Sequence, residues 1–146
     1  MAINRNAFTD ASAQPEKRSN RIYKDFNLNF SRHPITGDIA TLSDVDAVKR
    51  SVRNLVNTNF YERPFHPEIG SNIRASLFEP VSPIIAEMLS KHVEDLINNF
   101  EPRVELASVT AFGDIDNNQY NITIEFYLLN SPDGLQEINL FLQRLR

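Results

Sequence analysis

The strongest constraint on the fold is the strict alternation of apolar and polar residues between positions 120 and 128. A period of two is the repeat of a β-strand that buries one face. Segments 103–114 and 137–145 also have strand composition, and turn-forming sequences at 114–118 and 131–134 separate the three segments. Together they predict an antiparallel sheet with 120–128 in its centre. The inward residues expected in the central and last strands are Tyr120, Ile122, Ile124, Phe126, Leu128, Ile138, Leu140 and Leu142, while Val104, Leu106, Thr110 and Phe112 mark the first strand.

Three helices are predicted upstream of this sheet. The first follows Ser43 or Asp44, the second runs from Ser71 to Leu77, and the third begins at Ser82. Serine is a favourable capping residue, and the proline after Ser82 suits the first turn of a helix. The expected buried residues are Val45, Val48, Val52, Leu55 and Val56 in the first helix, and Ile84, Ile85, Met88, Leu89, Leu96 and Ile97 in the third.

A further strand is predicted from Asp25 to Phe30, with Phe26, Leu28 and Phe30 on its buried face. The element order is therefore β-α-α-α-β-β-β. This order predicts an α+β fold, in which a small, mostly antiparallel sheet carries its helices on one face.

The chain of 146 residues is the length of one domain. Residues 1–20 are polar and predict a flexible N-terminal arm, and residues 21–146 form the single domain. Ile3 and Phe8 are the large apolar residues of the arm, and they either anchor it on a partner or are incidental.

Composition excludes several classes of protein. A net charge of −4 argues against a dedicated nucleic-acid binder, which usually carries a basic face. The absence of cysteine excludes disulfides, thiolate metal sites and a cysteine nucleophile, and it fits folding in a reducing compartment. No apolar run reaches the roughly 18 residues needed to span a membrane, and no secretion signal is recognisable at the N-terminus.

Catalytic signatures are weak. His33, His66 and His92 have no metal-binding spacing, and the serine-nucleophile and phosphate-loop patterns are missing. Glu79 and Glu101 are the best candidates for a pair of carboxylates that could hydrolyse a glycosidic bond. An acid catalyst needs a raised pKa, whereas an arginine two residues after Glu101 favours the ionised form. We therefore expect no enzymatic activity and keep a peptidoglycan hydrolase as the alternative.

Two segments have the character of protein-binding surfaces. Residues 61–70 form a loop stiffened by prolines at positions 64 and 67. At the end of the third helix stands Glu101-Pro102-Arg103. This unit either joins helix to strand through a local ion pair or directs its charges at a partner, where arginine can make forked bonds to carbonyl or carboxylate oxygens. On the second interpretation, Arg103→Ala folds normally but fails to assemble.

These motifs carry a family resemblance. The succession Arg63-Pro64-Phe65, Gly70-Ser71, Leu77-Phe78-Glu79-Pro80 and Glu101-Pro102-Arg103-Val104 resembles the baseplate wedge and sheath-initiator family of contractile phage tails, whose relatives include the TssE component of type VI secretion baseplates. The resemblance extends over residues 22–146. Some members of that family carry a lysozyme label, which this sequence supports with no persuasive acid pair.

The resemblance implies a structural protein of the virion tail baseplate, assembled in the bacterial host cytoplasm in six copies per baseplate. Its fold would be similar to the interweaving domain of the tail sheath subunit, and its sheet would receive strands from the first sheath ring. The implied partners are tail sheath subunits, the core-bundle proteins of the wedge, and tail tube or hub proteins, without nucleic acid, membrane or cofactor. The expected partner-binding residues are Arg63, Pro64, Phe65, Glu101, Pro102, Arg103, Ile138, Leu140 and Leu142.

The last strand supports this expectation on physical grounds. The sequence stops at Arg146, so no later segment is expected to cover the edge of the sheet. Addition of a partner strand to such an edge is a common mode of recognition.

Overall fold

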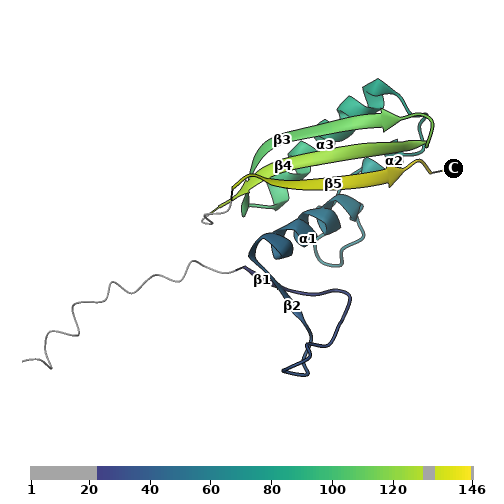
Figure 1. The fold of residues 1–146 in the computed structure, drawn as a ribbon. Coiled ribbons are helices and arrows are strands. Elements are labelled where there is room, and N and C mark those ends of the chain that lie inside the picture. Colours follow the sequence, from purple (N-terminus) through teal and green to yellow (C-terminus); the bar gives the residue numbers. More distant parts are fainter. Residues whose placement is uncertain (1–22, 130–133, 146) are drawn as a thin grey trace, which may run out of the picture.

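The computed structural model describes residues 23–129 and 134–145. A short antiparallel hairpin comes first, followed by three helices and then a three-stranded sheet (Figure 1). The elements are β1 (Lys24–Phe26), β2 (Thr41–Ser43), α1 (Asp44–Asn57), α2 (Ile73–Ser76), α3 (Pro83–Phe100), β3 (Val104–Asp114), β4 (Gln119–Leu128) and β5 (Gln136–Gln143). The predicted α+β class and antiparallel sheet are confirmed, with β2 as an additional strand.

The main sheet has the order β3-β4-β5, with β4 in the centre as predicted. The β4–β5 ladder is regular, and every residue of β5 has a partner on β4. The β3–β4 ladder contains a bulge between Leu106 and Ser108. Because one extra residue shifts the side-chain alternation, Val109 and Ala111 pack on the core while Thr110 and Phe112 are exposed.

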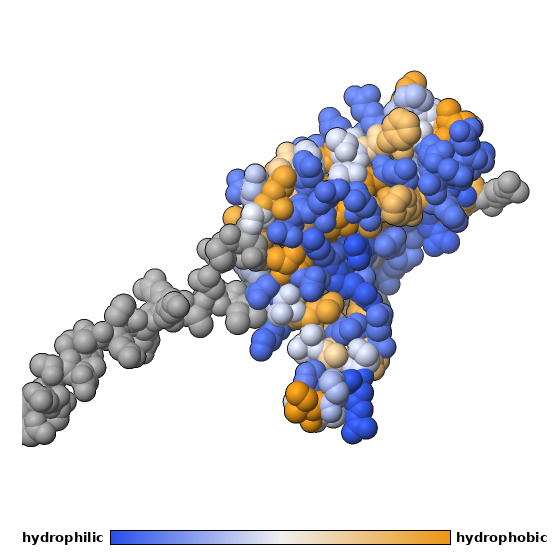
Figure 2. Space-filling model, viewed as in Figure 1, coloured by the Kyte–Doolittle hydropathy of each residue, from blue (hydrophilic) through white to orange (hydrophobic). Residues whose placement is uncertain are grey.

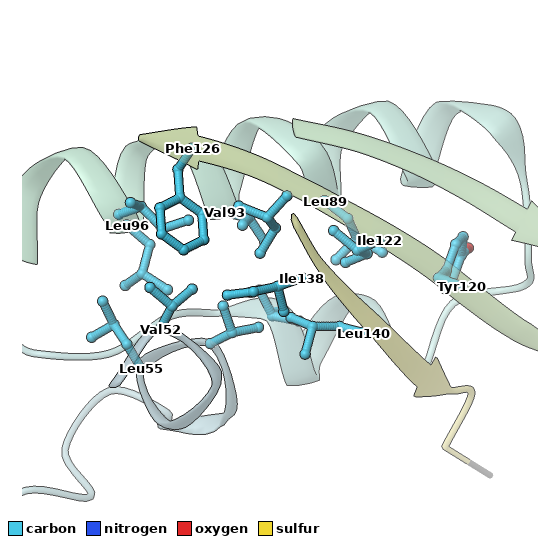
Figure 3. Close-up of a cluster of buried hydrophobic side chains, with 14 of the residues drawn as sticks. Val52, Leu55, Leu89, Val93, Leu96, Tyr120, Ile122, Phe126, Ile138 and Leu140 are labelled. Atoms are coloured by element: carbon cyan, nitrogen blue, oxygen red, sulfur yellow. The ribbon is translucent and has the colours of Figure 1, made fainter. Parts of the chain in front are cut away.

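One apolar core lies between the inner face of this sheet and the helices (Figure 3). α3 packs along the sheet beneath β3, and α1 packs against α3 and β5 (Figure 1). The alternating residues of β4 are all buried as predicted, and so are Ile138 and Leu140 of β5. From α1, the predicted residues Val48, Val52, Leu55 and Val56 join them.

The expected long strand at 25–30 is wrong. β1 has three residues and pairs only with β2, in a small sheet of its own. Phe26, Leu28 and Phe30 are 68%, 50% and 70% exposed. These apolar residues do alternate with polar ones, as in an amphipathic strand. The hairpin, however, stands away from the core, so no second layer covers them (Figure 1).

The expected buried face of α3 needs a correction at its start. Ile84 is 77% exposed and Met88 is 42% exposed, whereas Leu89 and Val93 are fully buried. The buried stripe is Ala86, Leu89, Val93, Leu96 and Ile97, which follows the helical repeat along a neighbouring row. The predicted cap is confirmed, since Ser82 Oγ accepts a hydrogen bond of 3.3 Å from the Ile85 amide.

One smaller expectation changes, and two others fall outside the described residues. The cap of α2 is Asn72, one residue later than predicted, although Ser71 Oγ still accepts a 3.4 Å hydrogen bond from the Ile73 amide. The arm at 1–20 lies outside the described residues, as does most of the predicted turn at 131–134.

Candidate partner-binding site

Glu101 occupies the junction where α3 ends and β3 begins. Its amide donates the last helical hydrogen bond to the Ile97 carbonyl at 2.9 Å, and its own carbonyl accepts from the Val104 amide at 3.2 Å. The proline between them cannot donate a backbone hydrogen bond and restricts the chain at the turn. This local geometry directs the Glu101 side chain inward, where it is only 4% exposed.

Three donors surround the buried carboxylate. Arg103 donates two hydrogen bonds to it from its guanidinium, at 2.6 Å from Nε to Oε1 and 2.8 Å from Nη2 to Oε2. Ser51 of α1 donates its hydroxyl to Oε2 at 2.6 Å. Burial raises the pKa of Glu101, but these hydrogen bonds and the charge of Arg103 outweigh burial and hold the pKa below the usual glutamate value. The carboxylate therefore links α1 to the α3–β3 junction as an ion.

Arg103 extends this network to the first strand. Its Nη1 lies 3.5 Å from Asp25 Oδ2, and its guanidinium carbon lies 5.6 Å from the centre of the Tyr23 ring. The bond to Glu101 raises the pKa of Arg103 further, against the effect of burial. The local ion pair, the first of the two interpretations of this unit, is thus present, and Glu101 of the same chain occupies the arginine fork. A partner would meet the quarter of the Arg103 side chain that remains exposed.

The loop between α1 and α2 is fixed at its root and open at its tip. Glu62 accepts hydrogen bonds from the amide and side chain of Asn59, at 2.9 and 2.6 Å, and the Tyr61 amide donates to the Pro67 carbonyl at 3.0 Å. At the tip, Phe65 is 97% exposed and has a positive φ of 70°. All three predicted residues of this loop, Arg63, Pro64 and Phe65, are exposed.

A groove of about 310 Å³ brings the loop and the buried ion pair to one side of the protein. Arg63 lines the groove together with Ser51 and Asp25. Ser51 also bonds Glu101, and Asp25 also contacts Arg103. Its remaining walls are Phe26, Leu28, Arg50, Asn54, Leu55, Ile69 and Phe100. Of the three predicted binding residues in the loop, Arg63 lines this groove beside the residues that contact Glu101 and Arg103. Pro64 and Phe65 do not line it.

The last three predicted residues lie on β5. Ile138 and Leu140 are buried, at 1% and 8% exposed, and Leu142 is half-buried. Their side chains anchor the strand on the core, so a partner strand at this edge would be recognised by main-chain N–H and C=O groups. The end of the strand is also secured, because the Leu145 amide donates to the Leu77 carbonyl at 2.9 Å.

Sequence reasoning missed Ser51, Asp25 and Tyr23. Ser51 lies beside the apolar stripe of α1, where a hydroxyl next to buried residues signals an internal polar partner. Asp25 alternates with the residues predicted to be buried and so gives no sign of an internal contact, yet its carboxylate lies 3.5 Å from Arg103 Nη1. Nothing local in the sequence pairs Tyr23 with a residue eighty positions away.

The described residues offer little support for catalytic chemistry. Across residues 23–129 and 134–145, no group of three His, Asp or Glu side chains is placed to hold a metal ion. Glu101, one of the two candidate acids, has its pKa shifted away from what an acid catalyst requires. Among the helices of those two segments, none is both long and apolar enough to cross a membrane.

Known proteins resemble this chain in sequence and in fold. A sequence model of the family described as Baseplate wedge protein gp25 matches residues 42–133, which is more than half of the chain. The chain is 26% identical over 121 residues to Baseplate wedge protein gp25 of Enterobacteria phage T4, covering 83% of this chain and 91% of that protein.

Two solved structures have a similar fold. A chain of the anti-feeding prophage baseplate superposes with a TM-score of 0.65 at 25% identity, covering 77% of this chain and 90% of that one. A Geobacter sulfurreducens protein described as a tail lysozyme superposes with a TM-score of 0.64 at 23% identity, covering 72% of this chain and 96% of that one.

Proposed function

This chain belongs to the family of Baseplate wedge protein gp25, and on that premise we propose that it joins the inner baseplate of a contractile phage tail to the first ring of the sheath and starts sheath assembly. Its proposed partners are sheath subunits and the core-bundle proteins of the wedge, with tube or hub proteins as further neighbours. The family identity makes it a structural component of the phage tail baseplate.

The observation that carries the proposal is the difference between the two edges of the main sheet. β3 contains a bulge, a device that twists an edge and hinders pairing with another chain. β5 is regular over its whole length and has no second neighbour among the described strands. Its unpaired main-chain groups offer a continuous template for a strand from a sheath subunit.

The second proposed contact is the groove beside Arg63. Arg50 and Arg63 line it without a carboxylate within 4 Å among the described residues, although Arg50 bonds the Asn29 side chain at 3.1 Å. The apolar walls and two arginines suit an amphipathic helix with acidic residues, such as a wedge bundle could present. Arg103 and Glu101 then serve by holding one wall of the groove in place.

Hydrogen exchange tests the strand-addition proposal. In the isolated protein, β5 amides that point away from β4 should exchange faster than the amides of β4, because the central strand is paired on both sides. With sheath subunits bound, those β5 amides should become protected while the β3 edge changes little. Equal protection of the β5 edge in both states, or protection of β3 instead, would contradict the proposal.

A lytic activity is the alternative, since one structural neighbour is described as a tail lysozyme. That neighbour shares 23% identity, so the likeness concerns the fold. Purified protein should leave a peptidoglycan suspension turbid, and so should the variants Glu79→Gln and Glu101→Gln. Clearing by the wild type that either variant abolishes would establish the hydrolase instead.

A further inference from the structure

Four residues of β5 carry the main-chain groups that point away from the sheet. In an antiparallel ladder, opposite residues alternate between pairs that exchange hydrogen bonds and pairs that do not. The Arg144 amide donates to the Asn118 carbonyl at 2.9 Å, one position beyond the last pair of the β4–β5 ladder. The even-numbered residues of β5 are therefore the ones that bond β4. The N–H and C=O groups that point away belong to Glu137, Asn139, Phe141 and Gln143.

This free edge ends at a pocket. The amide of Leu145, the next along the chain, points away from β4 and donates to the Leu77 carbonyl at 2.9 Å. Leu77 thus takes the main-chain position that an added strand would need next. A pocket of about 220 Å³ lies at this point, between α2 and the ends of α1 and β5. Its lining residues are Val56, Asn57, Asn59, Ile73, Arg74, Leu77, Leu142 and Leu145.

The pocket has the size and the lining for one apolar side chain. Its volume is below the range of about 300–1,000 Å³ that is usual for small-molecule sites, and most of its lining residues are apolar. In strand addition, main-chain hydrogen bonds supply affinity and pockets for alternate side chains supply specificity. Leu142 packs on the core side of the sheet and also lines the pocket. A residue placed opposite Leu142 in an added strand would therefore lie over the pocket.

Positive charge at this end of the edge has no acidic partner. Arg74 is exposed at the rim of the pocket, and no carboxylate oxygen of the described residues lies within 4 Å of its guanidinium. Arg144 also forms no ion pair with the described residues, and its buried Nε has no hydrogen-bond partner among them. The pocket end of the edge therefore favours an acidic side chain on the partner strand.

Negative charge stands at the other end of the same edge. Glu137 lies directly opposite Glu125 of β4, and like charges in such a pair are destabilising. Asn139 donates a hydrogen bond to Glu137 at 2.9 Å but brings no positive charge. The other acids of the sheet, Glu105 and Asp114, belong to β3 on the far side of β4. A lysine or arginine opposite Glu137 in an added strand would compensate its charge.

The two faces of an added strand would meet different surroundings. Figure 2 shows the outer face of the sheet, where hydrophilic side chains predominate between apolar patches, whereas the inner face packs on the core. Because side chains alternate along a strand, the residues opposite Glu137 and Leu142 would point to opposite faces. A slip of one residue would turn the base toward the core and withdraw the apolar side chain from the pocket.

On the basis of the proposed addition of a sheath strand at β5, we propose that the pocket beside Leu142 receives one branched apolar side chain of that strand and fixes its register. The strand carries a lysine or arginine five positions from this anchor, opposite Glu137. It also carries an acidic residue close to the anchor, beside Arg74. The apolar anchor and the two charges distinguish this strand from other extended segments.

Methyl NMR of the full chain with added sheath subunits detects the anchor, and hydrogen exchange in the same sample reports strand addition. The methyl signals of Ile73, Leu77 and Leu142 should shift on binding, because a new side chain enters the pocket. The methyl signals of Ile84, which is 77% exposed on α3, should stay in place. Protection of the β5 edge without these shifts would overturn the pocket proposal and leave strand addition standing. Absence of both effects would overturn both proposals.

A substitution at the exposed rim tests the pocket through the dissociation constant for sheath subunits. Asn57→Phe fills the pocket from outside the core and should weaken binding at least about tenfold. Asn57→Ala leaves the pocket empty and should bind within about twofold of wild type. Urea unfolding verifies that both variants are folded. Equal affinities of the two variants would overturn the proposal.

Charge reversals test the two ends of the edge in the same assay. Arg74→Glu and Glu137→Lys should each weaken binding about fivefold or more at low salt, and less at high salt. Arg53→Glu and Glu105→Lys make the same charge changes at exposed positions of α1 and β3 that do not line the pocket or the edge. These controls should stay within about twofold of wild type. Losses as large in the controls as at the test sites would overturn the assigned charge pattern.

Discussion

The Glu101–Arg103 pair holds the protein together before it meets any partner. The carboxylate is almost fully buried, and its three hydrogen bonds come from α1 and from the start of β3. A charge in such a place is tolerated only with partners of good geometry. The Glu101-Pro102-Arg103 unit, which resembles a recognition motif in the sequence, therefore also stabilises the fold through contacts within the chain.

Arg103→Ala should unfold more easily than the wild type, in contrast to the expectation from sequence alone. The change leaves a buried carboxylate with Ser51 as its remaining donor, which should cost about 2–4 kcal/mol in the free energy of unfolding. Arg103→Lys keeps the charge but loses the fork and should cost about 1 kcal/mol. Urea denaturation measures both. The exposed Arg63→Ala serves as the control, within about 0.5 kcal/mol of wild type.

The stabilisation from Glu101 should depend on pH in a defined direction. Its folded pKa is depressed, so its contribution is fully present above the unfolded value of about 4.3 and is lost as pH falls through the lower folded value. The stability difference between wild type and Glu101→Gln should stay constant from about pH 7 to pH 5 and shrink below about pH 4. Urea titrations across this range measure it, and a gap that widens in acid would contradict the assignment.

The sequence predicts the ionised state of Glu101, because Arg103 is two residues away. It does not predict Ser51, since the two residues are 50 positions apart and meet only when α1 packs beside α3. Local spacing allows the ion pair of Glu101 and Arg103 as one of two interpretations, but it carries no information about the hydroxyl of α1 that completes the network.

At the scale of elements, the loop after α1 depends on a close approach of two backbones. A Cβ on Gly70 would lie 2.6 Å from the Asn59 carbonyl carbon and oxygen and 2.7 Å from the Phe60 nitrogen. Gly70 also has a φ of +156°, which side chains rarely adopt. Glycine here closes the loop that carries Arg63.

Gly70→Ala should therefore destabilise the protein by about 2 kcal/mol, because backbone atoms cannot yield as a flexible side chain does. Gly134→Ala is the matched control, since a Cβ there has no neighbour within 4 Å among the described residues and should change stability by less than about 0.5 kcal/mol. Thermal or urea unfolding compares the two. Equal stabilities would mean that the loop accommodates a methyl group by moving.

The sequence predicts a strand or helix correctly where its apolar residues have another layer of the protein to pack against. β4 was identified correctly because its alternation matches a face covered by helices. The same alternation at Phe26, Leu28 and Phe30 failed, since periodicity reports amphipathicity and says nothing about whether another layer lies opposite. On α3, Ile84 and Met88 differ from the buried row by less than one helical turn, and only the packing against β3 selects the row.

For the whole molecule, one continuous core joins the helices to the sheet. Phe126 is fully buried in this core, on the side where Val93 and Leu96 of α3 and Val52 of α1 lie (Figure 3). A chain with a single such core should unfold in one cooperative step, without separate loss of helices or strands.

Phe126→Ala should cost about 3–5 kcal/mol, which is a large part of the stability of a typical domain. Phe112→Ala removes the same side chain from the exposed face of the same sheet and should cost less than about 1 kcal/mol. Circular dichroism during urea unfolding measures both, with helix and sheet signals lost together. Separate transitions for the two signals would show that α1 or α3 folds independently of the sheet.

The regular ladder between β4 and β5 has a mechanical consequence. All eight residues of β5 are paired in register, and the hydrogen bonds lie perpendicular to the strand. A force pulling along β5 loads these bonds together in shear, whereas a force at right angles would open them one after another. A strand added to this edge and pulled along its axis would meet the same resistance. The edge is thus oriented to transmit tension lengthwise, from whatever is attached there into the core.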